Sequence, residues 1–278
     1  EDVMGSEVAQ KSKQKDSSDP NAWFFGGVEK KPGDANPKKQ PGEIRSPGGI
    51  KTQAEIVIHS RLAHSCFYGR KRTSEKYGIT GLLQFSHNMR YIWDMAAADD
   101  PYADAKLLEI EKALDDAFEI IARDTKYVDT LLGGMGSISI TSDESDSPIK
   151  LPLSFRTPYG FMAARLLADF DSLIMKIISA SHVGLLWGDD RHKLENNSGK
   201  KLRNAFAMSA FFKASGTTRD DFAANNARAR EAIERFGKVD EDILSGKHRA
   251  KVSPKVSNQI VRDQFDQKHS DEIKEGAE

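Results

Sequence analysis

The sequence predicts a mainly helical α+β domain. Long segments repeat apolar residues at spacings of three and four, the period of an amphipathic helix. Two short segments, residues 54–59 and 149–156, instead alternate apolar and polar residues as half-buried strands do. The chain is 38% hydrophobic and 30% charged over 278 residues. These values are more polar than those of a typical globular protein and predict polar arms around an ordinary core.

The arms are predicted at both ends. Residues 1–50 contain five of the ten prolines and no leucine, so they cannot bury enough apolar area to offset the chain entropy lost on folding. We expect a disordered N-terminal arm over 1–50, a globular domain over 51–252 and a flexible tail over 253–278. Within the arm, Trp23-Phe24-Phe25 is either a short docking motif or a fragment that packs back on the domain.

The first half of the domain is predicted to begin with a strand and to continue in helices. Residues 54–59 supply the strand, and the basic run Arg70-Lys71-Arg72 falls in a loop. A helix follows from about residue 81 to residue 97. Asp99-Asp100-Pro101 stops that helix and caps the next, which runs to about residue 130 with one apolar stripe.

Residues 149–156 form the clearest strand pattern in the sequence. Its inward members are Ile149, Leu151, Leu153 and Phe155, and its outward members are Lys150, Pro152, Ser154 and Arg156. The strand therefore has one apolar face and one cationic face. Residues 137–141 are predicted to pair with it as a short strand.

Two helices are predicted after this strand. Thr157-Pro158 begins the first, because proline suits the first helical position, and this helix runs to about residue 181. The second begins with the polar residues Asn197, Ser198, Lys200, Lys201 and Arg203. Its positive dipole end and these cations would converge on one anion. A further helix is expected from about residue 220 to residue 236.

Strand, helix, turn and basic-headed helix is the order of a ribbon-helix-helix DNA-binding unit, in which two chains pair their strands and lay the polar face in the major groove. The local charge favours this interpretation. Lys and Arg outnumber Asp and Glu by 6 to 2 in residues 53–92 and by 10 to 5 in residues 148–213. Residues 93–147 carry 4 against 14, either as the solvated face of a long helix or as a contact surface for another protein.

Either residues 51–60 or residues 149–156 could supply the ribbon strand. The later strand is favoured because its surroundings are positive. For the earlier one, the second helix would begin among Asp99, Asp100 and Asp104, which would repel phosphate.

Other classes of function find little support in the sequence. His59, His64 and Cys66 are close in sequence but have no second cluster to complete a metal site. The motifs of nucleotide binding, hydrolase chemistry and metalloproteases are absent, so we expect no enzyme activity and no cofactor. No apolar run reaches membrane-span length and no secretory leader is recognisable, which predicts a cytoplasmic protein.

The region from about Glu55 to Val252 resembles the AcaB family, transcriptional regulators of conjugative IncC-type plasmids with relatives in integrative conjugative elements. The segments that carry the resemblance are 67–72, 78–82, 99–104, 151–162, 166–171 and 182–186. The resemblance implies a homodimeric ribbon-helix-helix activator that binds upstream of a promoter and raises expression of conjugation genes. RNA polymerase or another regulator would be a further partner.

The sequence thus predicts sequence-specific binding of promoter DNA by a homodimer. Lys150, Ser154 and Arg156 are expected at base edges, Asn197, Ser198, Lys200, Lys201 and Arg203 on phosphates, and Arg70, Lys71 and Arg72 on further phosphates. The alternative is a structural or adaptor protein of the conjugation apparatus that docks through the acidic helix and the aromatic triplet.

Overall fold

The computed structural model describes residues 54–134 and 145–257, which belong to one compact unit. The domain is mainly helical, as predicted, with two small antiparallel sheets of two strands each in the described residues. Residues 1–53, with the Trp23-Phe24-Phe25 motif, the predicted strand at 137–141 and residues 258–278 lie outside the described residues.

A ribbon of two strands forms the first sheet. β1 (Ala54–Ile58) and β4 (Ile149–Leu153) pair antiparallel, with Ile56 opposite Leu151. The alternation predicted from the sequence holds for Ile56, Ile58 and Leu153, which are buried, whereas Ile149, predicted to point inward, is 43% exposed at the start of β4. The strand is shorter than predicted, however, and ends before Ser154 and Arg156. The partner of β4 is β1 of the same chain, so both candidate strands contribute to one ribbon.

The short helix α1 (Arg61–Tyr68) follows β1 and was not predicted. Ser60 caps it, because its side chain accepts a hydrogen bond from the Ala63 amide at 3.1 Å. A hairpin of β2 (Gly69–Arg70) and β3 (Ile79–Thr80) then carries the basic loop. Gly69 has a φ of 71°, and a side chain there would collide with the backbone of Ile79 and Gly81.

Two predicted helices are confirmed in the centre of the chain. α2 (Leu82–Ala97) is followed by α3 (Pro101–Gly133), and Asp100 caps α3 by accepting from the Tyr102 amide at 2.9 Å. The acidic face of α3 is not simply solvated, as one interpretation of the sequence had it. Asp104, Glu111 and Asp124 are buried.

Two long helices that pack against each other follow β4. α4 (Pro158–His182) begins and ends where the sequence predicts. α5 (Gly188–Ala207) begins at Gly188 rather than at Asn197, with Trp187 at its N-cap position. The predicted helix start at Asn197 is therefore wrong, because the polar segment before it is helical too.

The segment after α5 contains three short helices: α6 (Arg219–Ala223), α7 (Ala227–Phe236) and α8 (Glu241–Leu244). The single helix predicted over 220–236 is interrupted where Asn225 adopts a φ of 46° and Asn226 caps α7. The packed chain continues to Ser257, whose amide donates to the Ala97 carbonyl at 2.8 Å.

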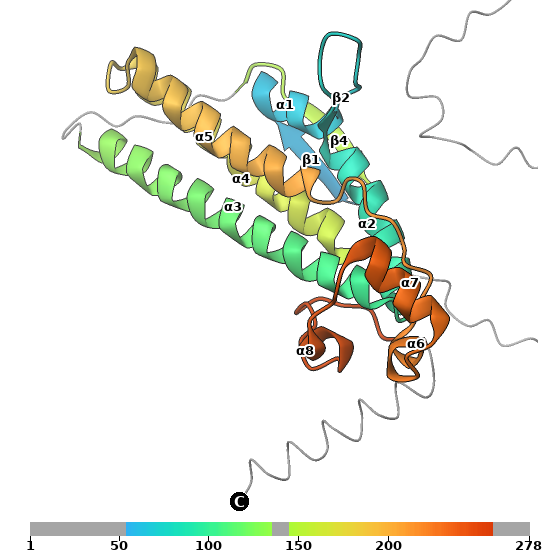
Figure 1. The fold of residues 1–278 in the computed structure, drawn as a ribbon. Helices are drawn as coiled ribbons and strands as arrows, with labels where there is room; N and C mark the ends of the chain where they lie inside the picture. The colour runs from blue at the N-terminus through green and yellow to red at the C-terminus, as the bar shows by residue number, and fades with distance from the viewer. Residues whose placement is uncertain (1–53, 135–144, 258–278) are drawn as a thin grey trace, which may run out of the picture. The chain divides into compact units, whose positions relative to one another are not determined.

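The core lies between α2, α3, α4 and α5, and α3, α4 and α5 run side by side (Figure 1). Its largest fully buried side chains include Tyr159, Phe85, Phe170 and Phe206. The ribbon, α1 and the β2–β3 hairpin lie on one side of these helices (Figure 1), with the β1–α1 turn bonded to Asp171 in the middle of α4. Among the described helices, none is long and apolar enough to cross a bilayer.

Candidate nucleic-acid interface

The outer face of the ribbon is the first part of the candidate interface. Opposed residues of an antiparallel pair point to the same side of the sheet. The buried side carries the pair Ile56 and Leu151, so the opposite side carries Val57 with Lys150 and Glu55 with Pro152. Lys150 is exposed there, as predicted. The face is only partly cationic, because Glu55 is also exposed.

The turn after β4 holds two more of the predicted base contacts. Ser154 and Arg156 are both exposed, on the segment between β4 and the N-cap of α4. Phe155 fixes this turn, since its ring packs edge-on against Phe161 with centroids 5.4 Å apart. It also covers Gly160 so closely that a Cβ there would lie 2.7 Å from the ring. Arg156 is therefore presented from a turn that the core anchors.

The hairpin presents the basic run as predicted. Arg70, Lys71 and Arg72 are exposed. The Arg70 guanidinium donates to the Tyr77 carbonyl at 3.2 Å and 3.1 Å, and the Arg72 guanidinium lies 6.0 Å from the centroid of the Tyr77 ring. Within the part of the chain that the structure describes, none of the three cations pairs with a carboxylate. They give the hairpin a net positive tip.

The predicted anion site at Asn197 and Ser198 is wrong, because the residues lie in the middle of α5 and have no helix terminus beside them. Ser198 is fully buried, and its hydroxyl donates to Asp124 at 2.7 Å. Asp124 also accepts from Arg123 at 2.7 Å. Ser198 is thus a packing contact between α5 and α3 and cannot reach a phosphate.

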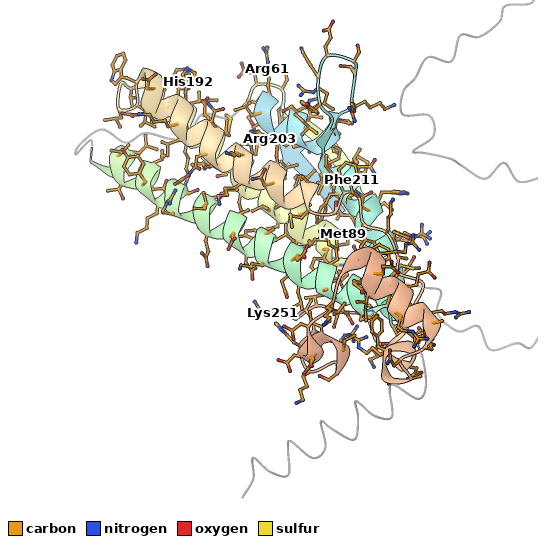
Figure 2. All side chains as sticks on the ribbon, in the orientation of Figure 1. Arg61, Met89, His192, Arg203, Phe211 and Lys251 are labelled. Atoms are coloured by element: carbon orange, nitrogen blue, oxygen red, sulfur yellow. The ribbon has the colours of Figure 1, made fainter. Side chains whose placement is uncertain are left out.

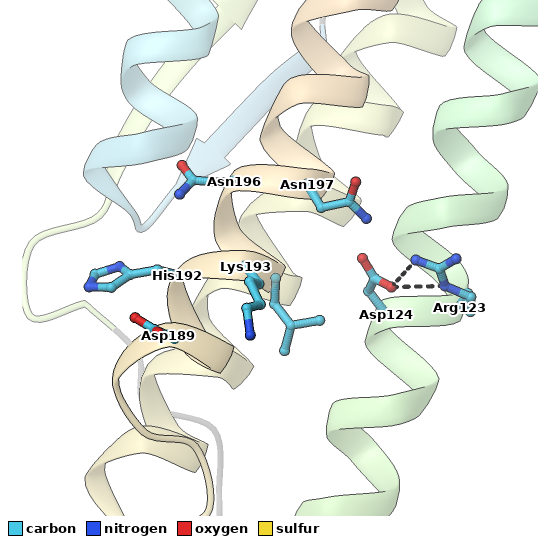
Figure 3. A pocket seen from close by; sticks show the side chains of 8 residues that line it. Arg123, Asp124, Asp189, His192, Lys193, Asn196 and Asn197 are labelled. Atoms are coloured by element: carbon cyan, nitrogen blue, oxygen red, sulfur yellow. Dashed lines mark hydrogen bonds and ion pairs between the residues drawn. The ribbon is translucent and has the colours of Figure 1, made fainter.

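Asn197 lies at an open groove between α3 and α5. The groove encloses about 610 Å³, and Asn197 points from α5 toward Asp124 and Arg123 on α3 (Figure 3). Lys193 and His192 line the same groove. Its charges are balanced by Asp124 and Asp189, so the groove has no clear preference for an anion.

The three cations of α5 have different surroundings. Lys200 and Lys201 are exposed, whereas Arg203 is half-buried against α1. Burial raises the pKa of the Cys66 thiol on α1, and the neighbouring Arg203 guanidinium opposes that shift. Figure 2 labels Arg203 on α5 and Arg61 at the start of α1. Since α5 also contacts β3, its cations and those of the hairpin lie on adjoining elements.

The role of Asp171 was not predicted from the sequence. This carboxylate of α4 is buried and accepts hydrogen bonds from the His59 amide at 2.7 Å and the Ser60 amide at 2.8 Å. It ties the β1–α1 turn to α4. The exposed Arg61 beside that turn was missed with α1 itself, although Ser60 followed by Ala63, Cys66 and Phe67 is a recognisable cap and apolar stripe.

Asp99 and Asp104 do not repel phosphate from the earlier strand as predicted. Both carboxylates are fully buried and paired with Arg219, whose guanidinium donates to Asp99 at 2.5 Å and to Asp104 at 2.6 Å. Arg249 binds Asp104 as well, with both bonds at 2.9 Å. Moreover, the second helix after β1 is α2, which begins beside the basic hairpin.

In the described residues, no group of three or more His, Cys, Asp and Glu side chains is arranged to hold a metal ion. A comparison with protein families gives a match to the model described as "Transcriptional regulator AcaB" over residues 46–257. The chain belongs to the AcaB family of transcriptional regulators.

A search of solved structures finds a similarity to selenomethionine-containing AcaB from uropathogenic E. coli. The identity is 11% and the TM-score 0.48, over 70% of this chain and 95% of that chain. No curated protein matches the chain. The assignment to the AcaB family therefore rests on the family match.

Proposed function

We propose that the protein regulates transcription by binding promoter DNA sequence-specifically, and that it activates genes of conjugative transfer, as the family resemblance implies. The observation that carries the proposal is the two-stranded ribbon. One face is buried on helices and the other, with Lys150, is open to solvent on the side of the domain that also bears the basic hairpin. A two-stranded ribbon is narrow enough to enter the major groove of B-form DNA.

The roles of the residues follow from their exposure. Lys150, Ser154 and Arg156 stand on or directly after the ribbon and are proposed as base contacts. An arginine that reads a guanine in the major groove contributes about 1–3 kcal/mol of discrimination. Lys71 and Arg72 extend from the hairpin and are proposed as phosphate contacts, which position the ribbon without reading sequence.

Lys200 and Lys201 are proposed as weaker phosphate contacts. They are exposed on α5, but they lie away from its N-terminus and gain no help from the helix dipole. Arg203 is assigned to the packing of α5 against α1, because it is half-buried beside Cys66.

A mobility-shift titration against fragments from the conjugative element tests the proposal. Promoter-upstream fragments should be retained in the presence of excess non-specific competitor, and Arg156→Ala should weaken that binding roughly tenfold and relax sequence choice. An adaptor protein, the alternative function, would show no preference between fragments. Reporter transcription with and without the protein then gives the sign of regulation.

The phosphate contacts are tested by the salt dependence of binding. Lys71→Gln should weaken binding to every fragment and lower the slope of log affinity against log salt by about 1. Lys238→Gln is the matched control, because this exposed lysine follows α7, where the Gly237 carbonyl is held by Tyr102 of α3. An equal loss of slope in both variants would contradict the placement of the DNA on the hairpin.

The homodimer that the resemblance implies is a further part of the proposal. A mass measurement of the free protein and of its DNA complex decides between one and two chains.

A further inference from the structure

The ribbon is complete within one chain. Five register pairs join β1 and β4, from Ala54 with Leu153 to Ile58 with Ile149. The domain can be divided into two halves, each a strand followed by two helices. The first half is β1–α1–α2, leaving out the β2–β3 hairpin, and the second half is β4–α4–α5, which follows α3. α1 packs on α4 and α2 on α5. This is the set of elements that two chains supply in an ordinary ribbon-helix-helix dimer.

A buried polar contact holds the two halves together. Asp171 comes from the β4–α4 half and accepts the amides of His59 and Ser60 from the β1–α1 half, at 2.7 Å and 2.8 Å. Buried amides and carboxylates need such partners. If a strand of another chain replaced β1, Asp171 would lose both of its hydrogen-bond partners, unless the other chain supplied the complete β1–α1 half.

The two strands are not equivalent on the face that would meet DNA. The outer residues of β1 are Glu55 and Val57, and those of β4 are Lys150 and Pro152. A symmetric dimer repeats the same residues on both strands. Here no residue type is shared, and one strand offers a carboxylate where the other offers an ammonium group. The two strands therefore cannot make identical base contacts.

From this we infer that a single chain is the DNA-reading unit, and that the DNA element under its ribbon lacks twofold symmetry. The inference rests on the proposed DNA binding and adds to it the kind of site that is recognised. Any dimer of the protein would then join two complete reading units, each on its own asymmetric element.

Disulfide trapping tests the ribbon itself. Val57 and Lys150 are register partners on the solvent side, and opposed Cα atoms of an antiparallel pair lie about 4.5–5.5 Å apart, within disulfide range. Val57→Cys with Lys150→Cys, in a Cys66→Ala background, should oxidise to a cross-linked monomer on a non-reducing gel. Lys150→Cys alone is the control and should stay monomeric. A covalent dimer in either protein, or no cross-link in the double variant, would overturn the inference.

Selection from random duplexes, followed by native mass spectrometry of the shortest bound duplex, tests the reading unit. We expect a non-palindromic consensus bound by one chain. Lys150→Ala should weaken contacts on one side of the element only, by roughly tenfold, whereas Glu55→Ala should alter the other side. A palindromic minimal element that needs two chains would refute the inference and leave DNA recognition intact. If no sequence is enriched at all, the proposed function itself fails.

Discussion

Replacing Asp171 with alanine should loosen the connection between the two halves of the domain. The carboxylate is 3% exposed and accepts two amide hydrogen bonds, at 2.7 Å from His59 and at 2.8 Å from Ser60. A buried amide left without a partner costs about 1–3 kcal/mol. The Ser60 amide is buried and loses its partner outright, whereas the half-exposed His59 can recruit water. The expected loss is therefore about 2–4 kcal/mol.

Urea unfolding followed by circular dichroism measures this loss. With a slope of about 3 kcal/mol/M, the upper end of the usual range, the midpoint should fall by about 1 M. Asp171→Asn keeps one oxygen acceptor and should lose about half as much. The neighbouring Ser172 is exposed, so Ser172→Ala should shift the midpoint little.

Hydrogen exchange gives a second measurement, because the amides of the β1–α1 turn should exchange faster in the Asp171→Ala variant. If this variant unfolds at the same urea concentration as Ser172→Ala, the carboxylate does not hold the two halves together and the reasoning is wrong.

Three further outcomes are expected. The Tyr159 hydroxyl is buried with no hydrogen-bond partner in the described structure, so Tyr159→Phe should leave the free energy of unfolding unchanged or raise it by about 1 kcal/mol. Tyr102→Phe should lower the free energy of unfolding, because the Tyr102 hydroxyl donates to the Gly237 carbonyl at 2.6 Å. Ser198→Ala should lower the free energy of unfolding by about 1–3 kcal/mol, because the 2.7 Å bond to Asp124 is lost, and should leave the DNA affinity of the folded protein unchanged. A loss of DNA affinity without a loss of stability would show that Ser198 contacts phosphate after all. Because burial raises the pKa of the Cys66 thiol above its ordinary 9.0, its contribution to stability is complete below pH 9.0 and is lost as pH rises through the folded value. Alkaline titration of the unfolding midpoint should therefore show a shallower decline for Cys66→Ala.

Local patterns predicted the long helices of the centre. α2, α3 and α4 each carry an apolar stripe with a clear start, such as Asp100 before Pro101 or Thr157 before Pro158, and these signals act within one or two turns of the chain. The inward side of the two strands was predictable for the same reason, since their alternation has a period of two.

Local patterns also misled. The polar stretch from Gly188 to Asn197 lacks a continuous apolar stripe, so the helix was expected to start at its end. The structure makes this stretch helical because α5 packs along α3 and α4, with Ser198 bonded to Asp124 across the contact. α1 is only eight residues long and was overlooked beside the basic run that follows it.

By itself, the sequence determined the positions of α2, α3 and α4, where the cations are concentrated and, through the resemblance, which family the chain belongs to. Only the tertiary structure decided that β4 pairs with β1 of the same chain, that Ser198 is buried, and that Asp99 and Asp104 are neutralised by Arg219. The reason is distance along the chain. Asp171 binds amides 111 and 112 positions away. A periodic pattern within the length of one helix cannot predict a contact between residues so far apart in the chain.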